Sequence, residues 1–289
     1  RRDDDPAIAV VRKLQSEYPQ VSSRLFVTGE PPYPNAKVFS LHTMMQQAAH
    51  DLCVMSNSDI RVTASLLQTV AAEFRDPSLG LSTCPYRAVA GQSFWSQLEA
   101  TGMNTDFLSG ILLARMIEGM KFAVGPTIVA RRKTIEVLGG FARVSEYLAE
   151  DFVLGKFAHE AGAGVALSSY VVEHHIGAQD FSHNAAHRLR WTRSTRRSRP
   201  SGYIGQLFTM PVPLALIAVM IQPVWWPILP VTFAIRFAVA LVMSSIVLGA
   251  KLNPFLLAIE DFAAFVFWCA GFFGNTIVWR GRRYKLLKD

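Results

Sequence analysis

The sequence predicts an α/β domain, with a mostly parallel sheet and flanking helices, that is followed by a C-terminal region of transmembrane helices. Short apolar runs alternate with helix-like patterns over the first 203 residues, as in domains built around a parallel sheet. From residue 204 the chain becomes strongly apolar, which explains a hydrophobic share of 51% and a mean hydropathy of +0.23. We therefore expect a first domain at 1–203 and a membrane region at 204–289.

The elements of the first domain follow from local signals. Pro6 comes directly after aspartates that can cap a helix, and Gly139-Gly140 ends another helical pattern. Helices are expected at 6–14, 41–49, 62–74, 94–120 with a break near Gly102, 134–138 and 150–160. Strands or extended segments are expected at 24–27, 52–55, 80–85, 121–131, 165–169 and 171–173.

Three apolar segments follow, at 207–221, 224–248 and 255–277. A membrane span needs about 20 apolar residues, so the second and third are long enough, whereas the first is short and is expected to be tilted or re-entrant. Arg236 lies within the second segment, where a charge is costly unless it is paired. We expect Glu260 or Asp261 to be its partner; the alternatives are that Arg236 snorkels or that the span breaks there.

The net charge of +7 admits nucleic acid, anionic lipid or phosphate-bearing substrates as partners. Position separates these possibilities, because six arginines lie between His187 and Pro200, immediately before the apolar region, and a basic tail begins at Arg280. Basic residues beside membrane segments are typical of the cytoplasmic side. We therefore expect an integral membrane protein without a nucleic-acid partner and with its first domain in the cytosol.

Carboxylates follow two of the predicted elements. Asn57-Ser58-Asp59 ends a buried strand, where a carboxylate can hold Mg²⁺ or Mn²⁺ on substrate phosphates. Glu150-Asp151 begins a helix, where one acid could serve as a general base. In both places a carboxylate could instead only cap a helix.

A third candidate is the run from His187 to Trp191. Arg190 can bind a phosphate while the indole of Trp191 packs against substrate or membrane; the alternative is a basic amphipathic helix lying on lipid. His174, His175, His183 and His187 raise the possibility of a zinc site, and the last two are four residues apart, but no HExxH motif is present. Histidines of the core or the surface are the more frequent case.

In chain order, these motifs and the Gly125-Pro126-Thr127 and Gly139-Gly140-Phe141 segments resemble family 2 glycosyltransferases of the GT-A fold, which bind nucleotide sugars. The resemblance is closer to the ceramide glucosyltransferase branch, family 21, and to its bacterial hopanoid-associated relatives. It extends over nearly the whole chain. Further matching segments are 4–8, 18–19, 24–26, 35–37, 59–62, 148–151, 190–192 and 279–284.

The resemblance implies an inverting transfer of glucose or N-acetylglucosamine from a UDP-sugar to a lipid hydroxyl, at a bacterial inner membrane, with Mg²⁺ or Mn²⁺. It makes Asp151 the base and Asp59 a ligand of the cation. The other residues implied by the family are Lys37 and Arg190 at the phosphates, Trp191 at the acceptor, and Asp4 or Asp5 near the nucleoside.

Some residues depart from the family pattern. Ceramide enzymes carry Asp where Asn57 stands, so either Asn57 or Asp59 could face the metal. His187 replaces the Gln or Arg that opens the Arg-Trp motif. Family members also carry a membrane helix and a first strand before this point, so we expect the chain to be N-terminally incomplete. A processive polysaccharide synthase and a non-enzymatic membrane scaffold with a degenerate transferase fold are the alternatives.

Overall fold

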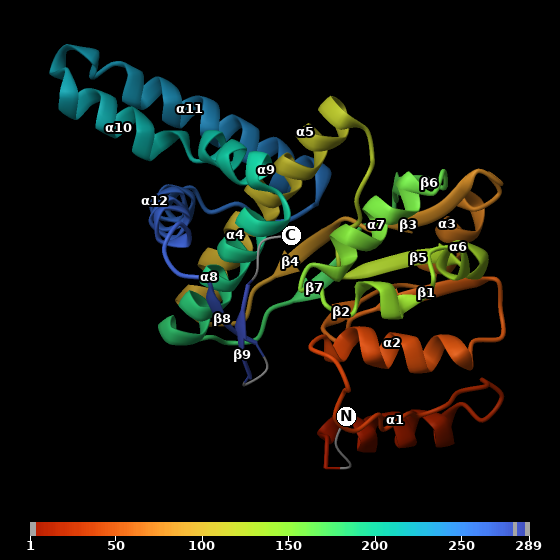
Figure 1. Ribbon diagram of the computed structural model, residues 1–289. Coiled ribbons are helices and arrows are strands. Elements are labelled where there is room, and N and C mark those ends of the chain that lie inside the picture. The colour runs from red at the N-terminus through yellow and green to blue at the C-terminus, as the bar shows by residue number, and fades with distance from the viewer. Residues whose placement is uncertain (1–3, 280–281, 287–289) are drawn as a thin grey trace.

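The computed structural model describes residues 4–279 and 282–286 and joins an α/β domain to long apolar helices (Figure 1). Its main sheet has the strand order β1-β5-β3-β6. The strands are Leu52–Ser56 (β1), Leu79–Thr83 (β3), Thr127–Arg131 (β5) and Gly164–Leu167 (β6). β3 is parallel to β6, whereas β5 is antiparallel to both β1 and β3. The α/β class is confirmed, and β1, β3 and β6 share one direction.

The reversed direction of β5 differs from the mostly parallel sheet that the sequence predicts. β5 lies between β1 and β3, so each of its own ladders is antiparallel. Its first four residues are buried, and such a continuous apolar run carries no signal of strand direction. Successive side chains of β5 point to opposite faces of the sheet. Ile128 and Ala130 belong to one of the two main core clusters and Val129 belongs to the other, so the sheet lies between the two clusters.

Helices cover both faces of the main sheet. On one face, the core cluster around Leu81 takes side chains from Ala36–Gln46 (α2), Arg132–Val137 (α6) and Glu150–Glu160 (α7). On the other face, Ser65–Glu73 (α3) and Phe94–Gly102 (α4) contribute to the second cluster. A short sheet of order β2-β7-β4 adjoins this second cluster. Its strands are Ile60–Arg61 (β2), Tyr86–Val89 (β4) and Val172–His175 (β7).

The expected break near Gly102 is confirmed as a wide helical turn. α4 continues into a π-helical segment, Met103–Phe107 (η1), and then into Leu108–Glu118 (α5). Within the turn, the side chain of Asn104 accepts a hydrogen bond from Ala88 N at 2.7 Å and donates to Ala88 O at 2.9 Å. The turn therefore satisfies backbone groups of β4 that no neighbouring strand reaches on that side.

The strand expected at 24–27 is not formed. These residues are irregular, and no described strand pairs with them. A strand needs a neighbouring ladder for its backbone groups, and an apolar run alone does not supply one. The preceding helix, Pro6–Glu17 (α1), begins at its predicted proline and is capped by Asp5, whose Oδ1 accepts from Ala7 N at 2.9 Å.

Within the described part of the chain, two helical stretches are long and apolar enough to cross a membrane, Pro223–Val247 and Pro254–Gly271. The first contains Ile228–Leu241 (α11) and the second is α12. The short segment expected at 207–221 is bent by 70° between Pro200–Thr209 and Pro211–Ile221 (α10). The third expected span ends at Gly271, because residues 276–279 form strand β8 of a hairpin with Arg282–Lys285 (β9). Arg280 and Lys288 of the basic tail lie outside the described residues.

The pairing of Arg236 is confirmed for one of its two expected partners. Arg236 is buried, and its Nε donates to Asp261 Oδ1 at 2.9 Å. Asp106 on η1 is a second partner that the sequence did not indicate. Glu260, the other candidate, binds Arg188 instead, with both contacts at 2.7 Å. Two ion pairs thus join the apolar helices to the α/β domain.

The arginines expected to anchor the chain at the membrane surface have another use in the structure. They belong to the long helix Phe181–Ser198 (α8). Arg193 donates to Phe273 O and Thr276 O at 3.1 and 2.7 Å, and Arg196 donates to Phe272 O at 2.6 Å. These carbonyls follow the end of α12 at Gly271, so the two arginines hold the segment between α12 and β8 against α8.

Candidate functional site

The acid pair predicted from the sequence is located at the first turn of α7. Glu150 is buried and fully engaged: Lys37 Nζ lies 2.8 Å from its Oε1, and Asn35 Nδ2 donates to its Oε2 at 3.1 Å. Asn35 also caps α2, so the starts of α2 and α7 are held together. Asp151 faces Gly125, where an added Cβ atom would lie 2.6 Å from Asp151 Oδ2. A side chain at position 125 would therefore crowd this carboxylate and displace it.

The surroundings of Asp151 suit it to exchange a proton near neutral pH. Burial and the negative charge of Glu150 raise the pKa of Asp151 to about 6, while the charge of Lys37 opposes that rise. A general base works best when its pKa lies near the working pH. A usual carboxyl group, with a pKa of about 4, is a weaker base than this one. Of the two neighbouring acids, Glu150 therefore fixes the geometry and Asp151 is the candidate base.

The loop after β1 lies beside this acid pair. Asn57 N donates to Pro126 O at 3.0 Å, and Pro126 follows the Gly125 that contacts Asp151. The hydroxyl groups of Ser56 and Thr127 are 2.9 Å apart and join the same two segments. The antiparallel pairing of β1 with β5 thus brings the predicted Asn57–Asp59 loop and the predicted base to one end of the sheet.

Asp59 has a partner that the sequence analysis had considered only as a possible zinc ligand. Its Oδ2 lies 3.2 Å from His174 Nε2 on β7. This hydrogen bond, against the effect of burial, lowers the pKa of Asp59, and the charges of His174 and Lys37 contribute to the lowering. The side chain remains 47% exposed. Asp59 is therefore an ionised carboxylate that solvent or a ligand can reach.

The residues near Asp59 fit a cation that also binds a substrate. Among the residues that the structure describes, no group of three or more His, Cys, Asp or Glu side chains could hold a metal ion by itself. Mg²⁺ usually keeps several waters and binds through one or two carboxylates plus phosphate oxygens. Asp59 and the amide oxygen of Asn57 are donors of this kind. The zinc site considered for His183 and His187 has no such cluster in the described chain.

Aromatic rings connect the Asp59 side of the site with the Arg190-Trp191 motif. Tyr86 lies 5.6 Å from His174 and 4.9 Å from Phe107, measured between ring centroids. Phe107 lies 6.2 Å from Trp191, and Trp191 lies 4.7 Å from His187. These rings come from β7, β4, η1 and α8, and only their three-dimensional arrangement identifies Tyr86 and Phe107 as members. Arg190 is half-buried on α8, one residue before Trp191.

Tyr86 lies between His174 and Phe107 in this row of rings. Burial raises its pKa well above the usual value, and the negative charges of Asp151 and Glu99 act in the same direction. Its phenol therefore stays neutral and can serve as a hydrogen-bond donor or acceptor within the site. The aromatic rings thus form a continuous row, here called the aromatic wall, from His174 on β7 to His187 on α8.

The two N-terminal aspartates lie on a peripheral element. Asp4 and Asp5 are both exposed, and Asp5 caps α1. α1, which the structure describes in full, buries none of its residues. In Figure 1 it runs beside α2, on the side away from the main sheet. A nucleoside contact for Asp4 or Asp5 stays a prediction.

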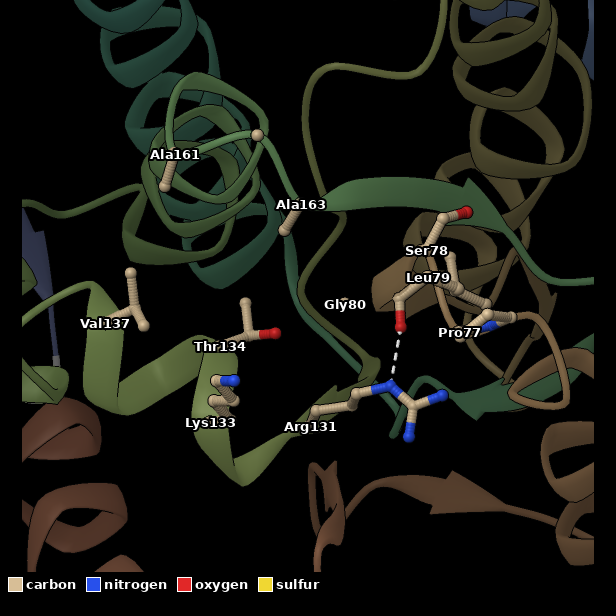
Figure 2. A pocket seen from close by; sticks show the side chains of 11 residues that line it. Pro77, Ser78, Leu79, Gly80, Arg131, Lys133, Thr134, Val137, Ala161 and Ala163 are labelled. Atoms are coloured by element: carbon tan, nitrogen blue, oxygen red, sulfur yellow. Dashed lines mark hydrogen bonds between the residues drawn. The ribbon is translucent and has the colours of Figure 1, made fainter.

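A surface hollow at the opposite end of the sheet is unrelated to these motifs (Figure 2). It lies where β3 begins and β5 ends, and Arg131, Lys133 and Thr134 are among the residues that line it. The Arg131 side chain is already used, because it donates to Leu79 O at 2.9 Å and to Phe74 O at 2.7 Å. Close packing of Gly80 against Ala163 and Thr134 narrows the hollow further. Its lining serves the packing of the sheet.

A loop that suits a divalent cation, a candidate base at a helix start and an Arg-Trp helix next to apolar helices are features expected of a membrane-associated glycosyltransferase. Residues 1–289 match glycosyl transferase family 21, and the chain belongs to that family. It is 24% identical over 170 residues to ceramide glucosyltransferase 1 of Caenorhabditis elegans and 25% identical over 168 residues to ceramide glucosyltransferase 3 of the same organism. Each alignment covers 58% of this chain and 36% of the relative.

Proposed function

We propose that this protein transfers glucose or N-acetylglucosamine from a UDP-sugar to the hydroxyl group of a membrane lipid, with inversion at the sugar. The observation that supports this most directly is the Asp151 carboxylate, with its raised pKa, facing Gly125 beside Lys37 and the Asn57–Asp59 loop. The names of the matched relatives support a ceramide-like acceptor. The resemblance to bacterial hopanoid-associated enzymes supports a hopanoid as the other candidate.

The proposed reaction is a single displacement. Asp151 takes the proton of the acceptor hydroxyl while the hydroxyl oxygen bonds to the anomeric carbon of the sugar. The bond between that carbon and the diphosphate breaks on the opposite side. A bound Mg²⁺ or Mn²⁺ would neutralise charge on the departing UDP, with Asp59 or Asn57 holding it. Lys37 and Arg190 contribute positive charge for the same diphosphate. Tyr86 and Trp191 exclude water from the acceptor side.

The membrane helices favour a lipid as acceptor. α8 carries Trp191 and packs along α12, one of the two stretches that are apolar enough to cross a membrane. A lipid hydroxyl in the bilayer surface could therefore approach Asp151 past α8. We propose that the α/β domain lies on the cytoplasmic face, where UDP-sugars are made, and that the membrane is a bacterial inner membrane.

The test uses the full-length protein in detergent with Mg²⁺ or Mn²⁺. UDP-glucose and UDP-N-acetylglucosamine are supplied separately with a bacterial lipid extract, and UDP release and new glycolipid are followed by mass spectrometry. A lipid-dependent product from one donor is expected, and it would identify both substrates. Products of increasing sugar number would indicate a processive synthase instead. Absence of UDP binding and of turnover with both donors would indicate a scaffold and contradict the proposal.

A further inference from the structure

A buried carboxylate on α4 holds two adjacent turns of α8. Glu99 is 4% exposed and uses both of its oxygens. Its Oε1 lies 2.7 Å from His187 Nδ1, and its Oε2 accepts from Asn184 Nδ2 at 2.6 Å. Residues three apart lie on one face of a helix, so the two hydrogen bonds fix the rotation of α8 about its own axis.

The same hydrogen-bonded chain continues to α12. Arg188 Nε donates to Asn184 Oδ1 at 3.0 Å, and the other guanidinium nitrogens of Arg188 bind both oxygens of Glu260 at 2.7 Å. Gly102 of α4 packs against Glu260, where an added Cβ atom would lie 3.0 Å from its Cδ. Three helices that lie side by side in Figure 1, namely α4, α8 and α12, are thus locked together through these polar groups.

The ionisation state of Glu99 agrees with this holding role. Burial acts to raise its pKa, but the hydrogen bond from His187 and the charges of His187, Arg188 and His174 outweigh burial and lower the pKa below its usual value. Glu99 is therefore a carboxylate that accepts hydrogen bonds and donates none. Because the Glu99 carboxylate can only accept, the hydrogen bond to His187 requires a proton on His187 Nδ1. This hydrogen bond fixes the orientation of the imidazole ring.

The orientation of His187 reaches the site through one ring contact. The His187 ring lies 4.7 Å from Trp191, one helical turn further along α8, and Trp191 continues the aromatic wall through Phe107. A shift of the imidazole would let the indole move. In the proposed function Trp191 borders the acceptor, so its position would affect how an acceptor reaches Asp151.

We propose that Glu99 is a positioning residue that sets the acceptor side of the site, acting through His187 on Trp191. The proposal rests on the proposed function in one respect, namely that Trp191 borders the lipid acceptor. It assigns the unusual histidine at the start of the Arg-Trp motif a defined partner on another helix. Lys37 and Asp59 on the donor side are held by other residues, so Glu99 is coupled to donor binding through Arg190 on α8 alone.

The main variant is Glu99→Gln, which keeps the size of the side chain. Its amide nitrogen replaces one of the two accepting oxygens and so meets either Asn184 Nδ2, which cannot flip without losing Arg188, or the protonated Nδ1 of His187. We expect kcat/KM for the lipid acceptor to fall about 10- to 100-fold, the range that misplacement of a reacting group produces. The KM for the UDP-sugar should change by a smaller factor, because of the proposed donor contacts Lys37, Asp59 and Arg190 only Arg190 lies on α8. Glu73→Gln is the matched control, because Glu73 also accepts several hydrogen bonds but lies on α3, away from α8.

Substitutions at His187 separate positioning from mere packing. His187→Gln retains an N–H donor for Glu99 and should keep about half of the activity or more. His187→Leu removes the donor, so its kcat/KM for the lipid acceptor should fall as far as that of Glu99→Gln. The double variant Glu99→Gln/His187→Leu should be little worse than either single variant, because both remove one interaction. Equal losses in His187→Gln and His187→Leu would overturn the proposal. So would a Glu99→Gln variant with unchanged acceptor kinetics.

A readout independent of activity completes the test. Hydrogen exchange of the backbone amides of α8 should become faster in Glu99→Gln than in the wild type, while α7 keeps its protection. If the wild type transfers no sugar from either donor, the proposed function fails, and hydrogen exchange then decides alone whether Glu99 positions α8. Unchanged exchange in α8 would overturn the positioning role. If Glu99→Gln does not fold, His187→Leu provides the same comparison.

Discussion

At the scale of single residues, Asp151 is the side chain on which transfer should depend. Asp151→Asn keeps the shape of the side chain and removes the base, so kcat should fall by about 10²- to 10⁴-fold, the usual contribution of a general base. The dissociation constant for UDP, measured by calorimetry, should not change. Glu146→Gln is the control, because Glu146 is an exposed acid just before α7. Loss of UDP binding together with transfer would make Asp151 a structural residue or a metal ligand.

The pH dependence of transfer offers a second test of the same residue. A base acts when it is deprotonated, so kcat/KM should rise with pH and level off above pH 6, because burial and Glu150 raise the pKa of Asp151 to about 6. Glu150→Gln removes the neighbouring negative charge and should move the rising limb to lower pH. Lys37→Met removes a positive charge that lowers this pKa and should move the limb to higher pH. If the rising limb moved in neither variant, it would report the titration of a group other than Asp151.

The chemical types of the candidate site residues could be predicted from the sequence, but most of their partners could not. Asp59 and Asp151 were identified because each follows or begins a recognisable element. Asp59 and His174 are separated by 115 residues, and Glu99 and His187 by 88, so no local pattern links them. These contacts depend on how the short second sheet and the helix pair α4 and α8 pack, which sequence periodicity does not encode.

At the scale of elements, the close packing of α7 decides where its acids lie. A Cβ atom on Gly155 would collide with the backbone of Phe122 and Ala123, which cannot move aside as a flexible side chain can. Gly155→Ala should therefore lower the free energy of unfolding by about 1–3 kcal/mol, as overpacking does, and should reduce transfer by displacing Asp151. Thermal unfolding in detergent would measure the loss.

The matched control for this prediction is Gly110→Ala on α5. Nothing lies within 4 Å of a Cβ atom placed there, so alanine should stabilise the helix by about 0.5–1 kcal/mol. If Gly155→Ala were as stable as Gly110→Ala, the contact between α7 and the 122–123 backbone would not limit the position of the helix.

Element boundaries that depend on local chemistry were predicted well, and those that depend on neighbours were not. α7 occupies the expected range of residues, 150–160, since its acids and the following Ala161-Gly162 mark both ends. The expected strand at 24–27 has no described partner, and the direction of β5 is set by β1 and β3 on either side of it. Similarly, the third apolar segment ends at Gly271, where Arg193 and Arg196 bind the carbonyls that follow α12.

At the scale of the whole molecule, the two regions expected from composition are interlocked. α12 packs on α4 and α8, and Tyr203, the last residue of the expected first domain, stacks on Trp268 of α12 with ring centroids 5.7 Å apart. On the other side, Arg87 of β4 donates to Leu248 O and Gly249 O at 3.2 Å, at the end of the first span. We therefore predict that the regions on either side of residue 204 fold together.

This interlocking predicts the behaviour of a fragment that ends at residue 203. In this fragment, the guanidinium of Arg188 would lose Glu260, and Arg193 and Arg196 would lose the backbone carbonyls that they bind. Removing one partner of a buried ion pair costs about 3–5 kcal/mol, and several such losses exceed much of the stability of an ordinary domain. Residues 1–203 alone should therefore aggregate or unfold without cooperativity, while the full chain in detergent melts cooperatively. Size-exclusion chromatography and circular dichroism would compare them, and a monomeric fragment that melts cooperatively and binds UDP would show that the α/β domain folds independently of the membrane helices.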